Sequence, residues 1–271
     1  MLAILNILIA IFMTIMYSIN INVQFNFFGI ATILGAFIVS FLIIVVVFLL
    51  IFIVFIYAFE KVNPKALWKH KVANLYSMYL FRFFNRVIVK VTGKENLPND
   101  KNFVVYSNHI EYIDPLLVKQ VYNDYALTFV AKEPLFKYIV LKNILYTLGA
   151  IPITKFADRS ALKSILQAIK QVKEGQPMGI FPEGKRTYSN DLIEFKPGAF
   201  KLAQKAKADI SPICLYNFHD LAKKPRILPT KVYIHILPII RYDDYKEMDS
   251  QTLANYVFEI VNGQMLKFKE N

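Results

Sequence analysis

One stretch decides how this chain is interpreted: Tyr106-Ser107-Asn108-His109-Ile110-Glu111-Tyr112-Ile113-Asp114-Pro115. It follows a short apolar run, Phe103–Tyr106, which predicts a buried strand. An imidazole can accept a proton from a hydroxyl group, and a carboxylate can fix its tautomer and stabilise its charged form. Positions five apart point in different directions on a strand or a helix, so His109 and Asp114 meet only across a turn. Pro115 favours such a turn, because proline keeps the preceding residue extended and suits the first position of a helix.

The same pair also has a purely structural interpretation. Asp114 would serve as the N-cap of a helix from Pro115 to about Tyr122, and His109 would be a satisfied histidine at a strand end. A His-x-x-x-x-Asp pattern is common by chance, so the pair alone favours this interpretation. Its chemistry therefore has to be judged from the rest of the sequence.

Charge is distributed unevenly along the 271 residues. Residues 1–59 contain no Asp, Glu, Lys or Arg, so the whole formal charge of +12 belongs to residues 60–271. A basic domain behind an apolar leader favours an anionic membrane surface as partner, since each Lys or Arg near anionic lipid adds about 1 kcal/mol. Nucleic acid agrees with the charge but not with the leader, and we do not expect it as a partner.

Residues 1–59 are expected to form a membrane-embedded segment of one or two helices. The run Met1–Ile19 lacks the basic start and the cleavage site of a signal peptide, the alternative interpretation. The run Phe28–Phe59 would extend about 48 Å as a helix, against a hydrocarbon core of about 30 Å, so it is expected to span. Lysines follow it, which predicts that the following domain is cytoplasmic. Whether the first run also crosses, or lies in the interface, stays open.

Residues 60–86 connect the leader to the basic domain. We expect a helix from Lys65 to Arg86 that mixes aromatic and basic side chains, a composition suited to the lipid headgroup layer. An ordinary core helix with a solvated face fits the same pattern equally well.

From residue 87 to residue 271, short β-rich runs alternate with helical stretches. The predicted strands are Val87–Val91, Asn102–Tyr106, Leu127–Ala131, Met178–Phe181, Ile210–Leu215 and Lys231–Leu237. The predicted helices are Pro115–Tyr122, Leu135–Leu148, Ser160–Glu174, Gly198–Lys207 and Ser250–Lys267. This alternation predicts an α/β domain with a mixed, largely parallel sheet flanked by helices.

Three further stretches stand out. Phe181-Pro182-Glu183-Gly184-Lys185-Arg186 ends a predicted strand in a turn, where glycine lets the backbone approach a ligand and the cations suit a phosphate. Leu148–Lys155, followed by Arg159, also ends an apolar run in cations. Ile210–Ile213 is a strand start with a proline. Either cationic stretch alone would pass for a surface turn with solvated charges.

Together, in this order and spacing, the four stretches resemble the motif blocks of the glycerolipid acyltransferases. The likeness is closest to the 1-acylglycerol-3-phosphate acyltransferases, which make phosphatidic acid. The family's blocks are Asn-His-x-x-x-x-Asp, a glycine with a strand and an arginine, Phe-Pro-Glu-Gly-x-Arg, and a strand with a proline. They fall here on Asn108–Asp114, Gly149–Lys155, Phe181–Arg186 and Ile210–Ile213. The likeness covers about residues 87–240 and implies a glycerolipid acyltransferase-like catalytic domain over residues 87–271.

Three positions depart from the family pattern. Glu111 stands where a small polar residue is usual, Lys155 where arginine is usual, and Lys185 where threonine is common. The departures leave the His–Asp pair intact and put the identity of the acceptor in question. Lys155 and Arg159 are both basic enough to contact a phosphate.

The resemblance implies transfer of a fatty acyl group from an acyl thioester to the free hydroxyl of lysophosphatidic acid. His109 would act as general base and Asp114 would hold its tautomer. The turn around Gly184 is a candidate source of donors for the oxyanion. The residues expected to bind substrate are Asn108, Lys155, Arg159, Phe181, Pro182, Glu183, Gly184, Lys185 and Arg186.

The acyl donor, acyl-CoA or acyl carrier protein, would be a co-substrate, and no cofactor or metal is expected. The histidines other than His109 have no ligand-spaced partner, and the single Cys214 predicts a buried packing residue. We expect an integral protein of the cell membrane with its catalytic domain on the cytoplasmic side. The alternatives are an acyltransferase acting on glycerol 3-phosphate or another lysophospholipid, a lipid hydrolase, and a non-catalytic lipid-binding protein.

Overall fold

The structure is a computed structural model that describes residues 2–83, 86–154, 159–219, 221 and 229–270. The chain divides into two compact units, Met1–Glu60 and Lys61–Asn271, called unit 1 and unit 2. Each unit is described by itself.

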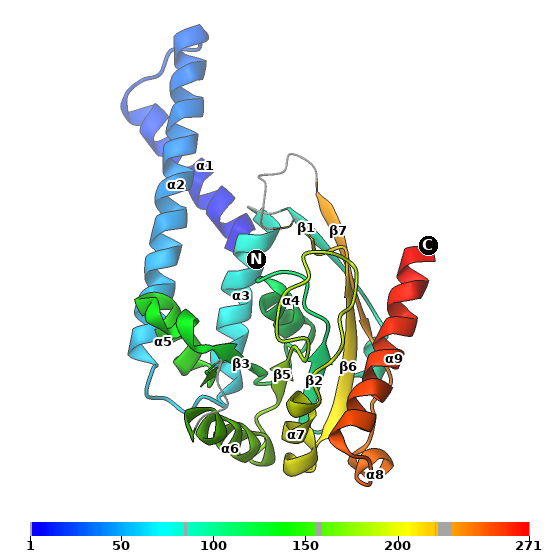
Figure 1. The fold of residues 1–271 in the computed structure, drawn as a ribbon. Coiled ribbons are helices and arrows are strands. Elements are labelled where there is room, and N and C mark those ends of the chain that lie inside the picture. The colour runs from blue at the N-terminus through cyan, green and yellow to red at the C-terminus, as the bar shows by residue number, and fades with distance from the viewer. Residues whose placement is uncertain (1, 84–85, 155–158, 220, 222–228, 271) are drawn as a thin grey trace. The chain divides into compact units, whose positions relative to one another are not determined.

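Unit 1 is a pair of helices, α1 (Leu2–Asn20) and α2 (Phe27–Ala58), that pack against each other (Figure 1). The turn between them is closed by Asn26, whose Oδ1 accepts the backbone N–H of Gly29 at 2.9 Å. Glycine is required at position 29, because a β-carbon there would lie 1.8 Å from the carbonyl oxygen of Gln24. The local sequence therefore determines where the chain reverses.

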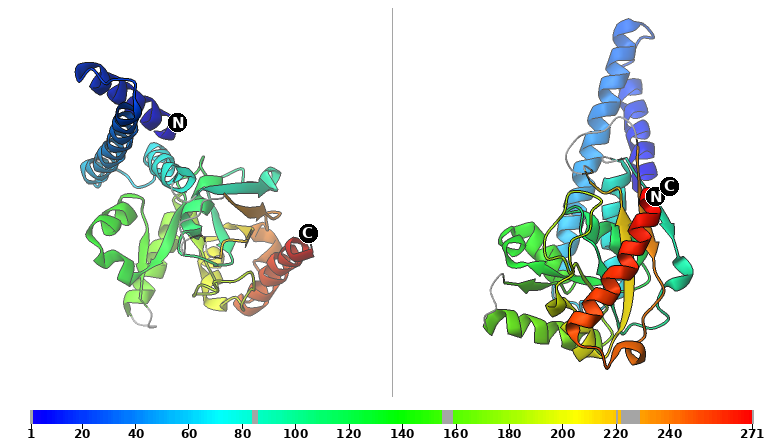
Figure 2. Two further views of the ribbon diagram at one scale, coloured as in Figure 1. Left: turned by 90° about the horizontal axis from the view of Figure 1, so that it is seen from above. Right: turned by 45° about the vertical axis from the view of Figure 1, so that its right-hand side comes forward.

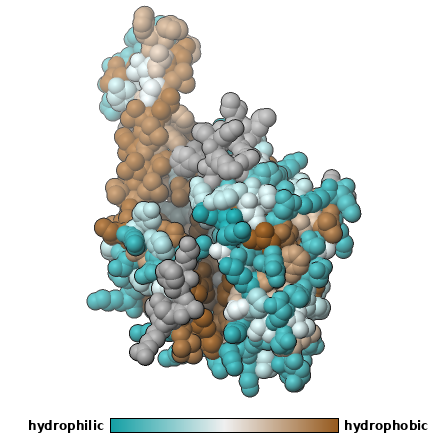
Figure 3. Space-filling model, in the orientation of Figure 1, coloured by the Kyte–Doolittle hydropathy of each residue, from teal (hydrophilic) through white to brown (hydrophobic). Residues whose placement is uncertain are grey.

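Both helices of unit 1 are long and apolar enough to cross a bilayer. Of their most apolar windows, 17% and 22% of the residues are buried, whereas a core helix of a soluble protein would be mostly buried. The surface of these helices is mainly brown, the colour of hydrophobic residues, in Figure 3. Length, composition and exposure together agree with membrane association.

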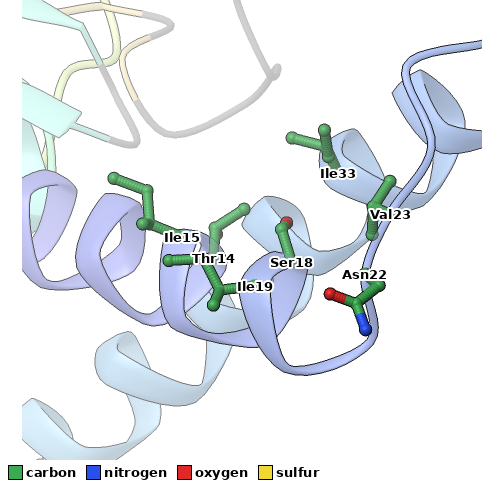
Figure 4. Close-up of a pocket in the computed structure, with 7 residues that line it drawn as sticks. All are labelled: Thr14, Ile15, Ser18, Ile19, Asn22, Val23 and Ile33. Atoms are coloured by element: carbon green, nitrogen blue, oxygen red, sulfur yellow. The ribbon is translucent and has the colours of Figure 1, made fainter.

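A hollow lies within unit 1 where α1 runs into the turn that leads to α2 (Figure 4). Its lining is Thr14, Ile15, Ser18, Ile19, Asn22, Val23 and Ile33. None of these side chains can exchange a proton near neutral pH, so the hollow offers no acid or base.

Within the described residues, seven strands of unit 2 form one sheet, in the order β1-β7-β6-β2-β5-β3-β4. Their bounds are β1 Val87–Thr92, β2 Phe103–Ser107, β3 Thr128–Lys132, β4 Ile151–Ile153, β5 Met178–Ile180, β6 Asp209–Tyr216 and β7 Thr230–Ile236. Neighbouring strands are parallel except β6 and β7, which are antiparallel. The predicted mixed, largely parallel α/β sheet is confirmed.

Helices cover both faces of this sheet (Figures 1 and 2). They are α3 Leu67–Phe83, η1 Lys94–Asn96, α4 Asp114–Val121, η2 Glu133–Lys137, α5 Ile139–Thr147, α6 Arg159–Lys173, α7 Pro197–Ala206, α8 Tyr242–Tyr245 and α9 Ser250–Glu270. Val104 and Tyr106 of β2 pack into a core with α7 and α9, while Phe103 and Val105 pack into a second core with α4. This alternation is the period of two of a strand buried on both faces.

Two predictions differ from the structure in more than the exact ends of an element. The run predicted as one helix over Leu135–Leu148 is split into η2 and α5, because the backbone of Tyr138 is extended (φ −84°, ψ 114°). Periodicity does not predict strand β4, because three residues are too few to show it, and only the family's second block implies a strand there. Both errors concern short elements whose form depends on their neighbours.

Helix α3 is anchored in unit 2 through basic side chains that the sequence placed among lipid headgroups. The Nζ of Lys69 donates to the carbonyl of Val62 at 2.8 Å, and His70 Nε2 lies 2.7 Å from the carbonyl oxygen of Pro64. His70 Nδ1 contacts Lys119 Nζ of α4. These three side chains are buried, which favours the core-helix interpretation of α3.

Candidate active site

The order of the strands brings two sequence motifs together. β2 and β5 are parallel neighbours, so the segments that follow them leave the sheet at the same edge. His109 follows β2, and the Phe181–Arg186 turn follows β5. The N–H of Thr187 donates to the carbonyl of His109 at 2.9 Å, and the N–H of Tyr188 donates to that of Ile110 at 3.2 Å. Backbone hydrogen bonds therefore hold the two motifs side by side.

The loop after β2 closes the His–Asp pair. His109 Nδ1 lies 2.8 Å from Asp114 Oδ2, and the same oxygen accepts the N–H groups of Ile110 and Glu111 at 2.7 and 2.9 Å. Since a carboxylate accepts, Nδ1 carries the proton and Nε2 presents a lone pair. Asp114 is fully buried, whereas 18% of the His109 side chain is exposed. The pair therefore has the geometry of a base whose free nitrogen a ligand can reach.

The predicted N-cap role of Asp114 is wrong. Helix α4 is capped by the backbone of Ile113, whose carbonyl accepts the N–H groups of Leu116 and Leu117 at 3.0 and 3.3 Å. The Asp114 carboxylate instead points back to the loop that carries His109. Its hydrogen bonds thus serve the imidazole and the loop, and not the helix.

Opposing effects act on the Asp114 carboxyl, and together they raise its pKa. Burial raises the pKa of the Asp114 carboxyl, because the charged form loses its water. Its hydrogen bond to His109, the charge of that ring and the N–H groups of Glu111 and Ile110 lower the pKa. The ionised carboxylate therefore depends on the histidine that it orients.

Aromatic rings hold the other face of the imidazole. The His109 ring stacks on Phe181, with centroids 4.1 Å apart and planes at 22°. Phe181 in turn stacks on Phe129 at 5.8 Å. Gly179 makes room for this stack, because a β-carbon there would lie 2.3 Å from the Phe129 ring. Phe181, predicted to bind substrate, therefore lies where it fixes the orientation of the base.

Asn108 takes a position different from the predicted substrate contact. Its Nδ2 donates to the carbonyl of Leu215 at 2.9 Å, and its Oδ1 accepts the Leu215 N–H at 2.8 Å. The side chain is 1% exposed and both of its polar groups are used. Asn108 thus ties the start of the His109 loop to β6, and the substrate role is corrected to a structural one.

Glu183 is buried beside the base and does not face the solvent. It is 1% exposed, and neither carboxyl oxygen has a hydrogen-bond partner among the described residues. Burial, and to a smaller extent the Asp114 charge, raise the pKa of Glu183 to about 8, although nearby backbone groups of His109 and Ile193 and the Lys185 charge lower it. A neutral Glu183 at the back of the His109 loop is the form that this site favours near pH 7.

Three cations surround the Gly184 turn. Lys185 and Arg186 are exposed, and the Arg186 guanidinium lies 5.9 Å from the Tyr112 ring centroid and 5.2 Å from that of Tyr188. Gly184 has a φ of +69°, which glycine adopts without strain.

Lys196 is the third cation of this turn, and the sequence did not reveal it. A β-carbon on Gly184 would lie 2.9 Å from Lys196 Nζ, and the Lys196 N–H donates to the carbonyl of Pro182 at 3.0 Å. In the sequence, only its place just before Pro197, where a helix can begin, indicates that Lys196 lies in a turn. Pro182 is buried, so it shapes the turn from beneath.

The structure describes little of the second cationic stretch, which contains Lys155 and Arg159. Lys155 lies outside the described residues, and Arg159 begins α6 without a described side chain. Which of them contacts a phosphate stays a prediction. In the described part of the chain, no three His, Cys, Asp or Glu side chains are grouped to hold a metal ion.

Known proteins resemble this chain in sequence and in fold. The family model described as Acyltransferase matches residues 88–216, which include the His–Asp pair and the Gly184 turn. A 1-acyl-sn-glycerol-3-phosphate acyltransferase from Borreliella burgdorferi is 35% identical over 181 residues, covering 65% of this chain and 70% of the relative. This chain belongs to the 1-acylglycerol-3-phosphate acyltransferase family. It is therefore an enzyme that transfers acyl groups.

Two further matches support the family assignment and the fold. A 1-acyl-sn-glycerol-3-phosphate acyltransferase from Bacillus subtilis is 36% identical over 124 residues, 46% of this chain and 60% of that protein. The crystal structure of the 1-acyl-sn-glycerophosphate acyltransferase PlsC from Thermotoga maritima superposes with a TM-score of 0.64 at 23% identity. It covers 80% of this chain and 88% of that one. At this identity the likeness concerns the fold.

Proposed function

We propose that this acyltransferase moves a fatty acyl group from an acyl thioester to the free hydroxyl of lysophosphatidic acid, giving phosphatidic acid and a free thiol. The observation that carries the proposal is the His109–Asp114 pair, 2.8 Å apart, beside a turn with three cations. The names of the relatives supply the acceptor.

The base acts through its free nitrogen. His109 Nε2 takes the proton of the acceptor hydroxyl as that oxygen attacks the thioester carbonyl carbon. The C–S bond then breaks, and the imidazolium returns the proton to the leaving thiolate. General base catalysis of this kind contributes about 10²–10⁴ in rate. The Asp114 carboxylate stabilises the imidazolium formed on the way.

The cations supply the charge that a phosphate requires. A guanidinium can bind a phosphate through two parallel hydrogen bonds, and an ammonium adds a point charge. Arg186, Lys185 and Lys196 lie at the turn that is hydrogen-bonded to the His109 loop, so a phosphate bound there would lie beside the loop that carries the base. This arrangement suits an acceptor with its phosphate and hydroxyl a few bonds apart.

The oxyanion donors expected around Gly184 need a different assignment. The Gly184 N–H donates to the carbonyl of Phe181 at 3.1 Å, so this group is occupied. Other donors of the turn, among them its cationic side chains, would have to supply these hydrogen bonds.

The membrane completes the proposal. Acceptor and product both carry long acyl chains, and helices of spanning length would hold the enzyme where these lipids are. The basic residues that follow Phe59 favour a cytoplasmic catalytic domain in an integral protein of the cell membrane. There, either acyl-CoA or acyl carrier protein could deliver the acyl group from the aqueous side.

An acceptor panel tests the proposal. Purified full-length protein is given lysophosphatidic acid, glycerol 3-phosphate or lysophosphatidylcholine, with acyl-CoA and acyl carrier protein compared as donors. Formation of phosphatidic acid from lysophosphatidic acid at the highest kcat/KM is expected. A higher kcat/KM with another acceptor would show that lysophosphatidic acid is not the preferred substrate. Release of free fatty acid without transfer to any acceptor would show that the protein is a hydrolase.

A further inference from the structure

An exposed apolar segment of unit 2 takes no part in the site described above. It runs from Lys132 at the end of β3 through η2 and α5 to Tyr146, and we call it the α5 surface. Ile139 and Tyr138 are its most exposed large residues, at 74% and 67%. Further exposed apolar side chains of this surface are Leu135, Val140 and Tyr146. Such a cluster, on one short stretch, marks an interaction surface.

The cluster is nevertheless well anchored to the domain. Phe136 of η2 is buried, and its ring packs against Tyr146 of α5 with centroids 4.9 Å apart. The extended backbone of Tyr138 between the two helices turns its side chain and that of Ile139 outward. The segment therefore presents these two side chains from a packed base.

The charge around the cluster is mainly positive. Lys132, Lys137 and Lys142 are exposed within the same stretch, and Glu133 is its one acidic residue. None of the three lysines forms a salt bridge with a residue that the structure describes. In Figure 3, hydrophobic and hydrophilic residues alternate in the region that α5 occupies in Figure 1.

We propose that the α5 surface inserts into the headgroup layer of an anionic membrane and orients the catalytic domain on it. Protruding Ile and Tyr side chains suit the boundary between headgroups and acyl chains. Lysine stems can lie along the apolar region while their ammonium groups meet lipid phosphates, each adding about 1 kcal/mol. Nine residues of α5 are far too few to cross a bilayer, so the contact is peripheral.

An acidic protein such as an acyl carrier protein is the competing partner, and the shape of the surface argues against it. Its apolar side chains protrude, and a lipid layer accepts them without a complementary shape, whereas a protein partner would need a pocket for each of them. The inference rests on the proposed function only in that the acceptor is a membrane lipid. Orientation by a second contact would hold the His109 loop toward that lipid.

Spin labels on the full-length protein test the contact directly. Ile139→Cys is labelled with a nitroxide, and Tyr256→Cys on α9, also exposed, is the matched control. The native Cys214 is fully buried, so the introduced thiol is the one that reacts. The proteins are reconstituted in vesicles of phosphatidylcholine with phosphatidylglycerol, and in phosphatidylcholine alone.

Accessibility to oxygen and to a water-soluble nickel chelate is then compared by electron paramagnetic resonance. At position 139, oxygen collisions should exceed chelate collisions several-fold in the anionic vesicles, and less so in the neutral ones. Position 256 should stay accessible to the chelate in both. A label at 139 that behaves like the control, or that is shielded only when acyl carrier protein is added, overturns the proposal.

A charge reversal separates this inference from the proposed function. Lys137→Glu with Lys142→Glu should lower turnover of acceptor embedded in anionic vesicles several-fold, and leave turnover of detergent-dispersed acceptor unchanged. Lys94→Glu with Lys101→Glu, exposed elsewhere in unit 2, makes the same change in charge and should affect neither. If both double variants lose the same share of turnover in vesicles, the proposal for the α5 surface is overturned. If the wild-type protein has no activity on the detergent-dispersed acceptor, the proposed function is contradicted instead.

Discussion

Asp114 and Lys119 lie five residues apart on α4, and both side chains are buried. In each case burial opposes the charge. It raises the pKa of Asp114, and it lowers the pKa of Lys119 to about 7. Each group also contacts a histidine: Asp114 meets His109, and Lys119 meets His70. One helix thus carries two buried ionisable pairs of opposite sign.

The pairs differ in what the second ring nitrogen does. His70 Nε2 must carry a proton, because it faces the carbonyl oxygen of Pro64 at 2.7 Å, and Nδ1 then accepts from Lys119. Burial lowers the pKa of His70 to about 3, so the ring stays neutral. His109 has Nε2 without a hydrogen bond in the described structure and a partly exposed ring. Both pairs therefore contain a group with a shifted pKa, but a substrate can reach only the His109 ring.

His109→Ala should produce the largest difference between the two pairs. Removing the base should lower kcat by about 10²–10⁴ while the fold persists, because the ring is partly exposed. Steady-state kinetics with circular dichroism checks both parts. His235→Ala removes another partly buried histidine, bonded to Thr92, and should leave kcat unchanged. Wild-type turnover in the His109 variant would show that the pair is structural.

Asp114→Asn should have the next largest effect. The amide leaves Nε2 in place but no longer stabilises the imidazolium or fixes the tautomer, so kcat should fall by about 10²-fold, with KM little changed. The neutral side chain avoids a buried charge, and the melting temperature should stay close to that of the wild type. A drop in stability without a drop in kcat would assign Asp114 to the loop alone.

Arg186→Ala should act on the acceptor and not on the base. Charged hydrogen bonds contribute about 1.5–3 kcal/mol, which corresponds to a rise of about 10- to 100-fold in the KM for lysophosphatidic acid. Arg186→Lys keeps a charge and should recover part of the loss. Lys205→Ala, at an exposed position of α7, is the control. An unchanged KM would remove Arg186 from the phosphate site.

Lys119→Met should have the smallest effect on catalysis and a clear effect on stability. The variant leaves the Leu127 carbonyl, which Lys119 Nζ meets at 2.7 Å, without its donor, so unfolding should become easier by about 1–3 kcal/mol near pH 7. Activity per folded molecule should not change. Lys71→Met removes an exposed pair with Asp124 and should cost far less.

The pH dependence of that variant has a definite sign. The lysine pKa is 10.5 unfolded and about 7 folded, so between these values the unfolded chain holds a proton that the folded chain has lost. Wild-type unfolding free energy should therefore rise with pH across this window, and the Met variant should lack that part of the rise. Denaturant midpoints measured across the window decide it, and parallel curves would contradict the depressed pKa.

What the sequence predicted well is local. The periodicity of the apolar residues predicts β2, β6, β7 and the long helices without knowledge of the elements that pack against them. Pro115 predicts the turn between His109 and Asp114. The start of α9 is equally local, since Asp249 Oδ1 accepts the Thr252 N–H at 2.8 Å, as an aspartate N-cap does. Each of these rests on contacts within a few residues.

What it predicted poorly depends on distant partners. Lysine is normally solvated, and the burial of Lys69 and Lys119 is accompanied by hydrogen bonds to the Val62 and Leu127 carbonyls, which the sequence does not show. The resemblance implies substrate contacts for Asn108 and Glu183, and nothing in the sequence shows that Asn108 bonds to β6 or that Glu183 is buried beside the His109 loop. Where these side chains lie is determined by partners that are distant in the sequence, and it becomes visible only in the tertiary structure.

The His–Asp pair closes within six residues of chain, while the cations at Gly184 come from a turn about seventy residues later. The catalytic base and the turn proposed to bind the acceptor therefore come from separate segments, joined by two backbone hydrogen bonds and by the stack of His109 on Phe181. Transplanting residues 182–196 from a relative with another acceptor is the smallest graft that would exchange one segment. A chimera should then show a new acceptor preference with the pH profile of kcat retained, and a shifted profile would show that the segments are not independent.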